Sequence, residues 1–274
     1  MSLPSPVVRA ERAAWRDGAL TQGSRAIAEE CAVAFSYGRA THAVMMATPA
    51  DLEDFAIGFS LTEAIITEVG QIERLDVVSV ENGIELRMDL AAERHAALDR
   101  RQRRLAGPTG CGMCGLDSLA EAMRCPPSVG NGPVVSAESL RGAMAAMPVM
   151  QTLNNETRAV HAAGFWQPGV GVRLVREDVG RHNALDKLAG ALARAGISPG
   201  AGALLLTSRV SVEMVQKAAM IGAPVIIAVS APTALAVRTA VAAGITLLAV
   251  ARADGFEIFS HPQRIFDEKH SHVA

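Results

Sequence analysis

The chain of 274 residues carries a formal net charge of −2, which excludes a protein held to nucleic acid by overall positive charge. Hydrophobic residues make up 50% and aromatic residues only 4%, so the core is built from small aliphatic side chains, as when helices pack on parallel strands. Four cysteines are too few for a disulfide scaffold, no signal-peptide pattern opens the chain, and no apolar stretch approaches the ~20 residues of a membrane span, so we expect a cytoplasmic protein without membrane contact.

The first 130 residues predict an irregular start followed by an α+β portion. Residues 1–30 are interrupted by Pro4 and Pro6 and show no clean hydrophobic period, so we expect no regular element there. Thr48 followed by Pro49 predicts a helix start, and Asn82-Gly83 predicts a tight hairpin turn. The elements expected in residues 31–130 are strands at 31–36, 41–46, 74–80 and 84–90, and helices at 49–66, 91–105 and 116–123.

Residues 131–268 predict an α/β domain, and residues 269–274 a frayed tail. After a helix at 136–147, short apolar strands alternate with helices of about ten residues or more, which is typical of βαβ units. We therefore expect a parallel sheet whose strands end at one shared edge. The expected strands are 171–176, 203–207, 224–229 and 245–250, and the expected helices are 182–195, 212–221 and 233–243.

A glycine-rich loop at 107–115 carries the most reactive pair of side chains. Cys111 and Cys114 are bracketed by glycines, which leave both sulfur atoms uncovered. The helix expected just beyond the loop places its positive end near the thiols, and the arginines upstream add to that field. Both effects lower a thiol pKa below ~8.5, so the pattern favours a nucleophile or a sulfur carrier.

Other uses of the cysteines fit less well. A structural zinc site needs four ligands, and only one Cys-x-x-Cys pair is present, so no metal is expected. A thioredoxin-like redox pair remains open, although no compact βαβ unit surrounds the motif. A zinc deaminase is excluded because no histidine is followed by glutamate two residues later. Cys31 lies in an apolar strand and is expected in the core, and Cys125 is expected to be incidental.

Polar side chains cluster just after the expected strands of the second half. In open α/β sheets ligands bind at this edge, where helix N-termini point their N–H groups at anions. Hydroxyls and arginines there suit phosphate or ribose contacts, although each segment alone could be a plain helix cap. His161, among alanines, is most simply a core residue. The candidate binding residues from this pattern are Arg181, His182, Asn183, Ser208, Arg209, Ser230 and Thr233.

Several long motifs resemble the FdhD family, the accessory sulfurtransferases or sulfur carriers of formate dehydrogenase. They are Cys111-Gly112-Met113-Cys114-Gly115, the segments 176–187 and 209–217, and Ser230-Ala231-Pro232-Thr233. The resemblance extends over about residues 28–260. One position departs from the family pattern: members carry Thr-Gly-Gly-x-His-Ala-Ala where this chain has Arg158 and Ala159 in place of the two glycines. If those glycines bring a ligand close to the backbone, that contact is altered here.

The resemblance implies a fold and a function. The fold is α/β, with a cytidine deaminase-like three-layer larger domain and a smaller α+β N-terminal portion. The chain would accept sulfur from a cysteine desulfurase as a persulfide on Cys111, with Cys114 as its companion. It would transfer that sulfur to the molybdenum bis-guanine dinucleotide cofactor before the cofactor enters formate dehydrogenase. The alternative is a non-enzymatic cofactor-binding chaperone with redox-sensing cysteines.

The resemblance also implies a homodimer and a cofactor-binding segment. That segment matches Val250, Ala251, Arg252, Ala253, Asp254 and Gly255. GDP-like nucleotides are expected to mimic the cofactor, because it carries two guanine dinucleotide pyrophosphates.

Overall fold

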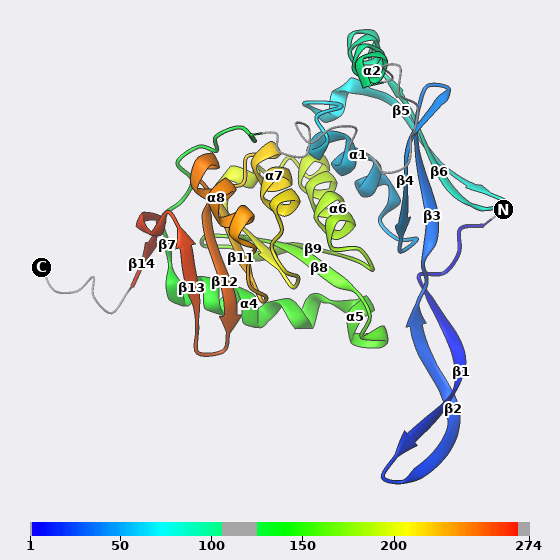
Figure 1. Ribbon diagram of the computed structural model, residues 1–274, viewed down its shortest axis with the longest axis vertical. Coiled ribbons are helices and arrows are strands. Elements are labelled where there is room, and N and C mark those ends of the chain that lie inside the picture. Colours follow the sequence, from blue (N-terminus) through cyan, green and yellow to red (C-terminus); the bar gives the residue numbers. More distant parts are fainter. Residues whose placement is uncertain (1, 106–124, 268–274) are drawn as a thin grey trace, which may run out of the picture.

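The computed structural model describes residues 2–105 and 125–267, and for residues 99–105 it describes the backbone alone. The chain forms a mixed α/β fold with several sheets (Figure 1). The cysteine loop at 107–115 and the helix expected at 116–123 lie outside the described residues. No helix in the described part of the chain is long and apolar enough to cross a membrane.

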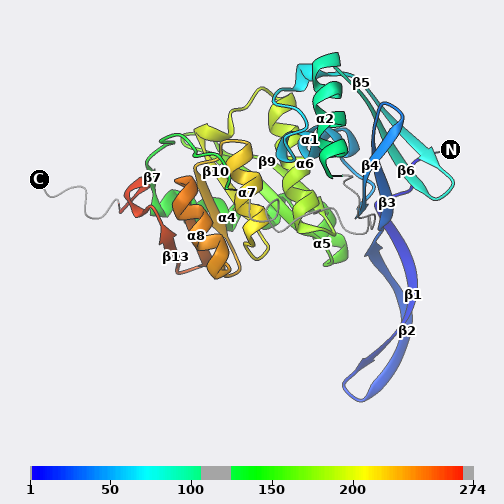
Figure 2. The same ribbon diagram turned by 45° about the horizontal axis from the view of Figure 1, so that its top comes forward.

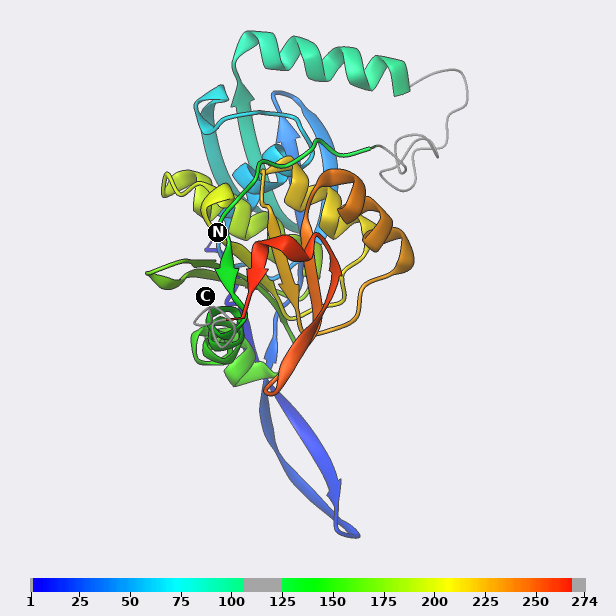
Figure 3. The same ribbon diagram turned by 90° about the vertical axis from the view of Figure 1, so that its left-hand side faces the viewer.

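The expectation of an irregular start is wrong. Strands β1 (Val7–Arg16) and β2 (Ala19–Ala28) pair antiparallel along their whole length and turn at Asp17 and Gly18. This β1–β2 arm projects from the body in every view (Figure 1, Figure 2 and Figure 3). Sequence periodicity could not reveal it, because both faces of the arm are largely exposed and no buried side alternates with a polar one.

A four-stranded sheet and one helix form the core of the N-terminal portion. The sheet order is β4-β3-β6-β5, and Phe35 on the sheet stacks on Phe59 of the helix with ring centroids 4.1 Å apart. The strands and the basic helix expected in this portion are confirmed. Their bounds are β3 (Cys31–Tyr37), β4 (Ala40–Ala47), α1 (Leu52–Thr62), β5 (Ile72–Val80), β6 (Gly83–Leu90) and α2 (Ala92–Leu105).

Helix α1 does not begin as the sequence predicted. Its N-cap is Asp51, whose φ of 52° is left-handed and whose side chain makes no capping hydrogen bond. Thr48 is instead fully buried and bonds to the second domain: its Oγ1 accepts a hydrogen bond from the N–H of Val179. A tertiary contact has therefore taken the hydroxyl that local pattern assigned to a cap.

The second domain contains a six-stranded sheet in the order β13-β12-β11-β10-β8-β9. The expected strands and helices are present, but the expected all-parallel sheet is wrong. An additional strand, β8, lies between β9 and β10 and runs antiparallel to both. The bounds are β7 (Val135–Ser136), α4 (Ala137–Met150), α5 (Thr152–Thr157), β8 (His161–Gln167), β9 (Gly171–Asp178), α6 (Arg181–Arg194), β10 (Ala203–Leu206), α7 (Val212–Met220), β11 (Val225–Ala228), α8 (Ala234–Ala243), β12 (Thr246–Arg252), β13 (Gly255–Ser260) and β14 (Ile265–Phe266).

Helices cover both faces of this sheet and give three layers (Figure 1). Helices α6, α7 and α8 bury one face in an aliphatic core that includes Leu185, Val215 and Leu247. Helix α4 covers the other face, where Leu140 and Met147 join Leu205 and Ile227. The small side chains that dominate the composition fill both cores.

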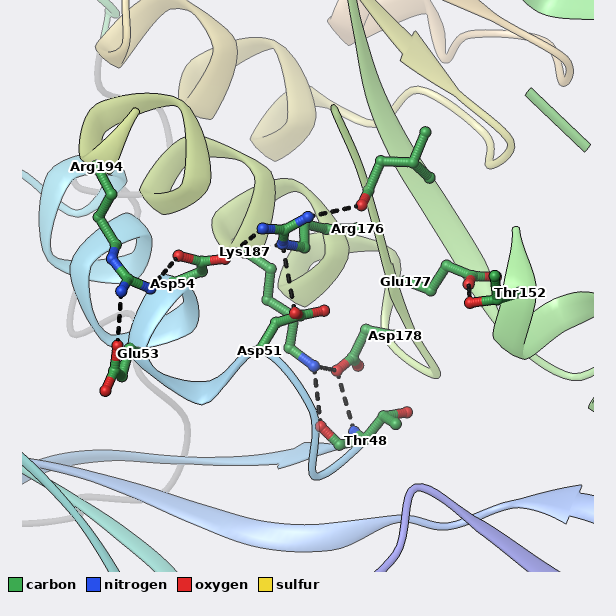
Figure 4. Close-up of polar contacts among 11 residues, drawn as sticks. Thr48, Asp51, Glu53, Asp54, Thr152, Arg176, Glu177, Asp178, Lys187 and Arg194 are labelled. Atoms are coloured by element: carbon green, nitrogen blue, oxygen red, sulfur yellow. Dashed lines mark hydrogen bonds and ion pairs between the residues drawn. The ribbon is translucent and has the colours of Figure 1, made fainter. Parts of the chain in front are cut away.

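The two portions are joined where α1 crosses α6. A Cβ on Gly58 would lie 1.6 Å from the carbonyl oxygen of Asp186, and one on Gly190 would lie 1.9 Å from that of Asp54. The backbones therefore touch, which only glycine permits. Around the crossing, Asp54 pairs with Arg176 and Arg194 at 2.8 Å each (Figure 4).

The crossing makes a stability prediction. Gly190→Ala should lower the free energy of unfolding by about 3 kcal/mol, because the new methyl group overlaps the backbone of α1. Gly142→Ala is the matched control, since Gly142 also lies within a helix but has open space around it, and it should gain about 0.5–1 kcal/mol. Urea unfolding followed by circular dichroism measures both. Equal effects of the two substitutions would contradict the close crossing.

Candidate functional site

The carboxyl ends of β9, β10, β11 and β12 meet at one edge of the large sheet. β9 runs parallel to β10 because each is antiparallel to β8, and β10, β11 and β12 are mutually parallel. The first turns of α6, α7 and α8 and the first residue of β8 therefore lie at this same edge. The polar segments predicted from the sequence all lie along this edge. Because β8 is inserted between β9 and β10, β9 and β12 are four strand spacings apart, or about 19 Å.

Arg181 and two histidines form the polar centre of the edge near β9. Nε of Arg181 and Nε2 of His182 are buried and have no hydrogen-bond partner among the described residues. His161, the first residue of β8, is half-buried beside them. Its expected place in the core is wrong, because β8 starts at the edge. The one hint to this position in the sequence was that His161 belongs to the motif in which this chain differs from the family pattern.

Charge and burial keep both imidazoles neutral. Burial lowers the pKa of His182, and the positive charge of Arg181 lowers it further, against the opposing effect of Glu213. Burial likewise lowers the pKa of His161, again with Arg181 as the next cause. At neutral pH the centre therefore holds one guanidinium charge between two uncharged rings that can donate or accept hydrogen bonds.

Glu213 adds a carboxylate that the sequence analysis did not select. Its Oε2 lies 3.6 Å from Nε2 of His182 and accepts a 2.6 Å hydrogen bond from Oγ of Ser211. This bond lowers the pKa of Glu213. Because the hydroxyl of Ser211 is used in this way, it does not cap α7.

The first turns of the three helices differ in their capping. Thr233 caps α8 by accepting a hydrogen bond from the N–H of Ala236. Of the two interpretations of this residue, ligand contact or helix cap, the helix cap is the one that the structure shows. No described side chain caps α6 or α7. Their first backbone N–H groups are available, and with Arg181 they form a cationic surface suited to an anion.

The remaining predicted residues near this surface divide into buried and accessible ones. Asn183 is buried, and its amide donates to the carbonyl of Met46 and to Asp178, so it joins the two portions. Ser208 is also buried and donates to the carbonyl of Arg209. Arg209 is exposed and Ser230 half-buried, and both can reach a ligand.

The segment 250–255 ends β12 with an irregular backbone. Val250 has a φ of 54°, a genuine outlier for a β-branched residue, and the β12–β13 register shifts between Ala249 and Arg252. The guanidinium of Arg252 donates through Nη1 to the carbonyls of Val229 and Ala251, which leaves its other N–H groups unused by these bonds. Strained backbone of this kind concentrates at ligand sites.

A hollow of about 460 Å³ lies beside this segment, on the face covered by α4. Arg141 on α4 donates to the carbonyl of Ala253 and to the carboxylate of Glu138. The hollow thus combines an apolar floor with two arginines. Its lining residues are Glu138, Arg141, Gly142, Met144, Ala145, Val229, Ala251, Arg252 and Ala253.

The backbone conformation at Arg158 explains why the family pattern has a glycine at this position. This residue ends α5 with φ 60° and ψ 30°, a left-handed conformation in which glycine is favoured. A glycine at this position is therefore accounted for by the backbone turn alone, without a ligand.

Cys111 and Cys114 lie outside the described residues. Cys31 is half-buried against the N-terminal core, as expected, and burial raises the pKa of its thiol. Cys125 is exposed. Within the described residues no cluster of three or more histidine, cysteine, aspartate or glutamate side chains could hold a metal ion.

Comparison with known proteins gives consistent matches over most of the chain. A model of the FdhD/NarQ family matches residues 28–266. The sulfur carrier protein FdhD of Agrobacterium fabrum is 52% identical over 266 residues, covering 97% of this chain and 98% of the relative. That of Brucella abortus is 51% identical over 255 residues, covering 93% and 95%. The crystal structure of a candidate formate dehydrogenase accessory protein from Desulfotalea psychrophila shares the fold, with a TM-score of 0.73, 23% identity and coverage of 95% and 99%.

The Arg181 centre predicts linked titrations. By NMR, His161 and His182 should both titrate below the ordinary value of about 6.5. Arg181→Gln should raise both pKa values, whereas Glu213→Gln should lower that of His182 alone. Because the unfolded chain takes up these protons first, stability should fall as pH drops from about 6.5, and less so in Arg181→Gln. Histidine pKa values that do not respond to Arg181→Gln would contradict this arrangement.

Proposed function

The chain belongs to the FdhD/NarQ family, and from that premise we propose that it is a sulfur carrier for the maturation of formate dehydrogenase. The observation that supports this most directly is the identity of about half of all residues with sulfur carrier proteins over nearly the whole length of both chains. The partners we propose are a cysteine desulfurase, which donates the sulfur, and formate dehydrogenase, which receives the finished cofactor.

Cys111 is the sulfur-bearing residue in this proposal. Its thiolate attacks the outer sulfur of a persulfide on the desulfurase, and the desulfurase cysteine leaves as a thiolate. One sulfur–sulfur bond forms and one breaks, so the step needs no external oxidant. In the second step the thiolate of Cys114 attacks the inner sulfur on Cys111, so that the outer sulfur leaves as sulfide for the molybdenum bis-guanine dinucleotide cofactor and a Cys111–Cys114 disulfide remains. One sulfur–sulfur bond again forms as one breaks, and the two thiols supply the electrons.

The edge of the large sheet is the proposed binding surface for that cofactor. Two pyrophosphates need several hydrogen-bond donors, and the uncapped first turns of α6 and α7 provide them beside Arg181. The segment 250–255 and the hollow next to it offer Arg252 and Arg141 at the other end of the edge. A long ligand with two nucleotide arms fits this separation better than a single small anion does.

We also propose that the larger domain is cytidine deaminase-like. What supports this is the arrangement of helices in two layers around a mixed sheet. The family resemblance adds that the deaminase zinc ligands are not retained.

The sulfur-carrier proposal is tested by mass. Incubation with a cysteine desulfurase and cysteine should add about 32 Da per sulfur, on the peptide that contains Cys111. Cys111→Ala should abolish this addition and the maturation of formate dehydrogenase, whereas Cys125→Ala is the matched control and should retain both. An unmodified mass for the parent chain would instead support a cofactor-binding chaperone whose cysteines only sense redox state.

Nucleotide binding is tested separately by calorimetry with GDP. Each charge-assisted hydrogen bond from an arginine contributes about 1.5–3 kcal/mol, so Arg252→Ala and Arg209→Ala should each weaken GDP binding about ten-fold or more. Arg238→Ala is a control, because Arg238 is exposed further along α8. No binding to the parent chain at millimolar GDP, or unchanged affinity in both variants, would place the cofactor elsewhere.

A further inference from the structure

Two arginines from distant parts of the sequence meet just before the start of β8. Arg25 on β2 donates a 3.2 Å hydrogen bond from Nη2 to the carbonyl oxygen of Thr157, the last residue of α5. That oxygen belongs to the peptide unit that leads into Arg158, so Nη2 of Arg25 lies within about 6 Å of the Cα of Arg158. Both arginines are exposed. The base of the β1–β2 arm and the end of α5 thus present two guanidinium groups on one small surface.

The positive charge of this pair is not neutralised within the described part of the chain. Neither Arg25 nor Arg158 forms an ion pair with a described carboxylate. Glu156, the carboxylate nearest to Arg158 along the chain, lines the hollow at the base of the arm together with Asp51. The bond to Thr157 uses one N–H of Arg25 and leaves its other donors unused. An anion at this surface would therefore meet two cations that have hydrogen-bond donors to spare.

Arg158 occupies its position at a cost in backbone energy. Its left-handed φ and ψ are unfavourable for any residue with a Cβ atom, whereas glycine adopts them freely. The family pattern has glycine here, and this chain has a long cationic side chain instead. Backbone strain of this kind persists mainly where a site uses the residue. Because Arg158 is exposed, that use is contact with another molecule.

The pair lies close to the polar centre of the large sheet's edge. Only two residues separate Arg158 from His161, so their Cα atoms are at most about 11 Å apart. His161 stands beside Arg181, whose charge lowers its pKa. In Figure 1 and Figure 3 the arm also extends to the same side of the molecule as the turn between β12 and β13, where the strands of the sheet end. Long arginine side chains can therefore reach a ligand that is bound at Arg181.

We propose that Arg25 and Arg158 bind the pyrophosphate of one nucleotide arm of the cofactor, in addition to Arg181 and the first turn of α6. The inference rests on the proposed function, because it takes the nucleotide cofactor as the ligand of this edge. A guanidinium suits a pyrophosphate because its planar fork donates two hydrogen bonds to neighbouring oxygen atoms. In this chain a side chain of residue 158 thus makes a ligand contact that a glycine of the family pattern cannot make.

Calorimetry of the full chain with inorganic pyrophosphate tests the site. Arg158→Gly and Arg25→Gln should each weaken pyrophosphate binding about five-fold, because each removes a charge-assisted contact that solvent partly screens. Arg9→Gln is the matched control and should bind as the parent does. Arg9 lies opposite Ala26 in the ladder, one position along from Arg25, so its side chain points to the other side of the arm. No binding to the parent at millimolar pyrophosphate would overturn the proposal.

Two further measurements separate ligand binding from other roles. Arg158→Gly should melt at or above the Tm of the parent, because glycine adopts the left-handed turn without strain, so its loss of affinity reports the missing side chain. If Arg25→Gln lowers Tm while both variants bind pyrophosphate like the parent, Arg25 only stabilises the end of α5 and the proposal is wrong. The sulfur added by a desulfurase at Cys111 should be the same in both variants and the parent. A parent that gains no sulfur would refute the sulfur carrier and leave the pyrophosphate result to stand by itself.

Discussion

The backbone contact between α1 and α6 is the constraint on which the arrangement of the two portions depends. At Gly58 and Gly190 the helices approach so closely that no side chain fits between them. Helix α6 begins at the edge of the large sheet, so its close contact with α1 fixes Arg181 and His182 relative to the N-terminal sheet. The composition, rich in small residues, is thus a requirement of this joint as well as of the cores.

Buried charges give the joint its specificity. Nζ of Lys187 lies 2.6 Å from Asp178 and donates to the carbonyl of Thr48 at 2.9 Å, with both charged side chains fully buried (Figure 4). A second buried lysine, Lys217, bonds to Thr62 and Asp186. Burying such charges costs desolvation energy, which is offset only when every partner is in place. A displaced α1 would leave these groups unpaired, so the pairs select one docked position.

This use of charge also explains which sequence inferences succeeded. Segment 176–187 was singled out for ligand binding because it is densely polar, but Arg176, Asp178, Asn183 and Lys187 bond within the protein and only Arg181 and His182 remain for a ligand. Strands and helices with regular apolar periods were predicted well. The arm and β8 were missed, since the arm has no buried side and β8 is apolar on nearly every residue, and Thr48 was misread because its partners are about 130 residues away.

The electrostatics of the edge couple ligand binding to proton binding. Arg181 lowers the pKa of both His161 and His182, so with both rings neutral its guanidinium is the positive charge that stands beside the carboxylate of Glu213. A pyrophosphate beside Arg181 would offset that charge and raise both pKa values, so each imidazole becomes a better proton carrier once the ligand is bound. By reciprocity, a lower pH should strengthen the binding of the anion. The neutral histidines thus allow the site to increase its positive charge in step with the charge of its ligand.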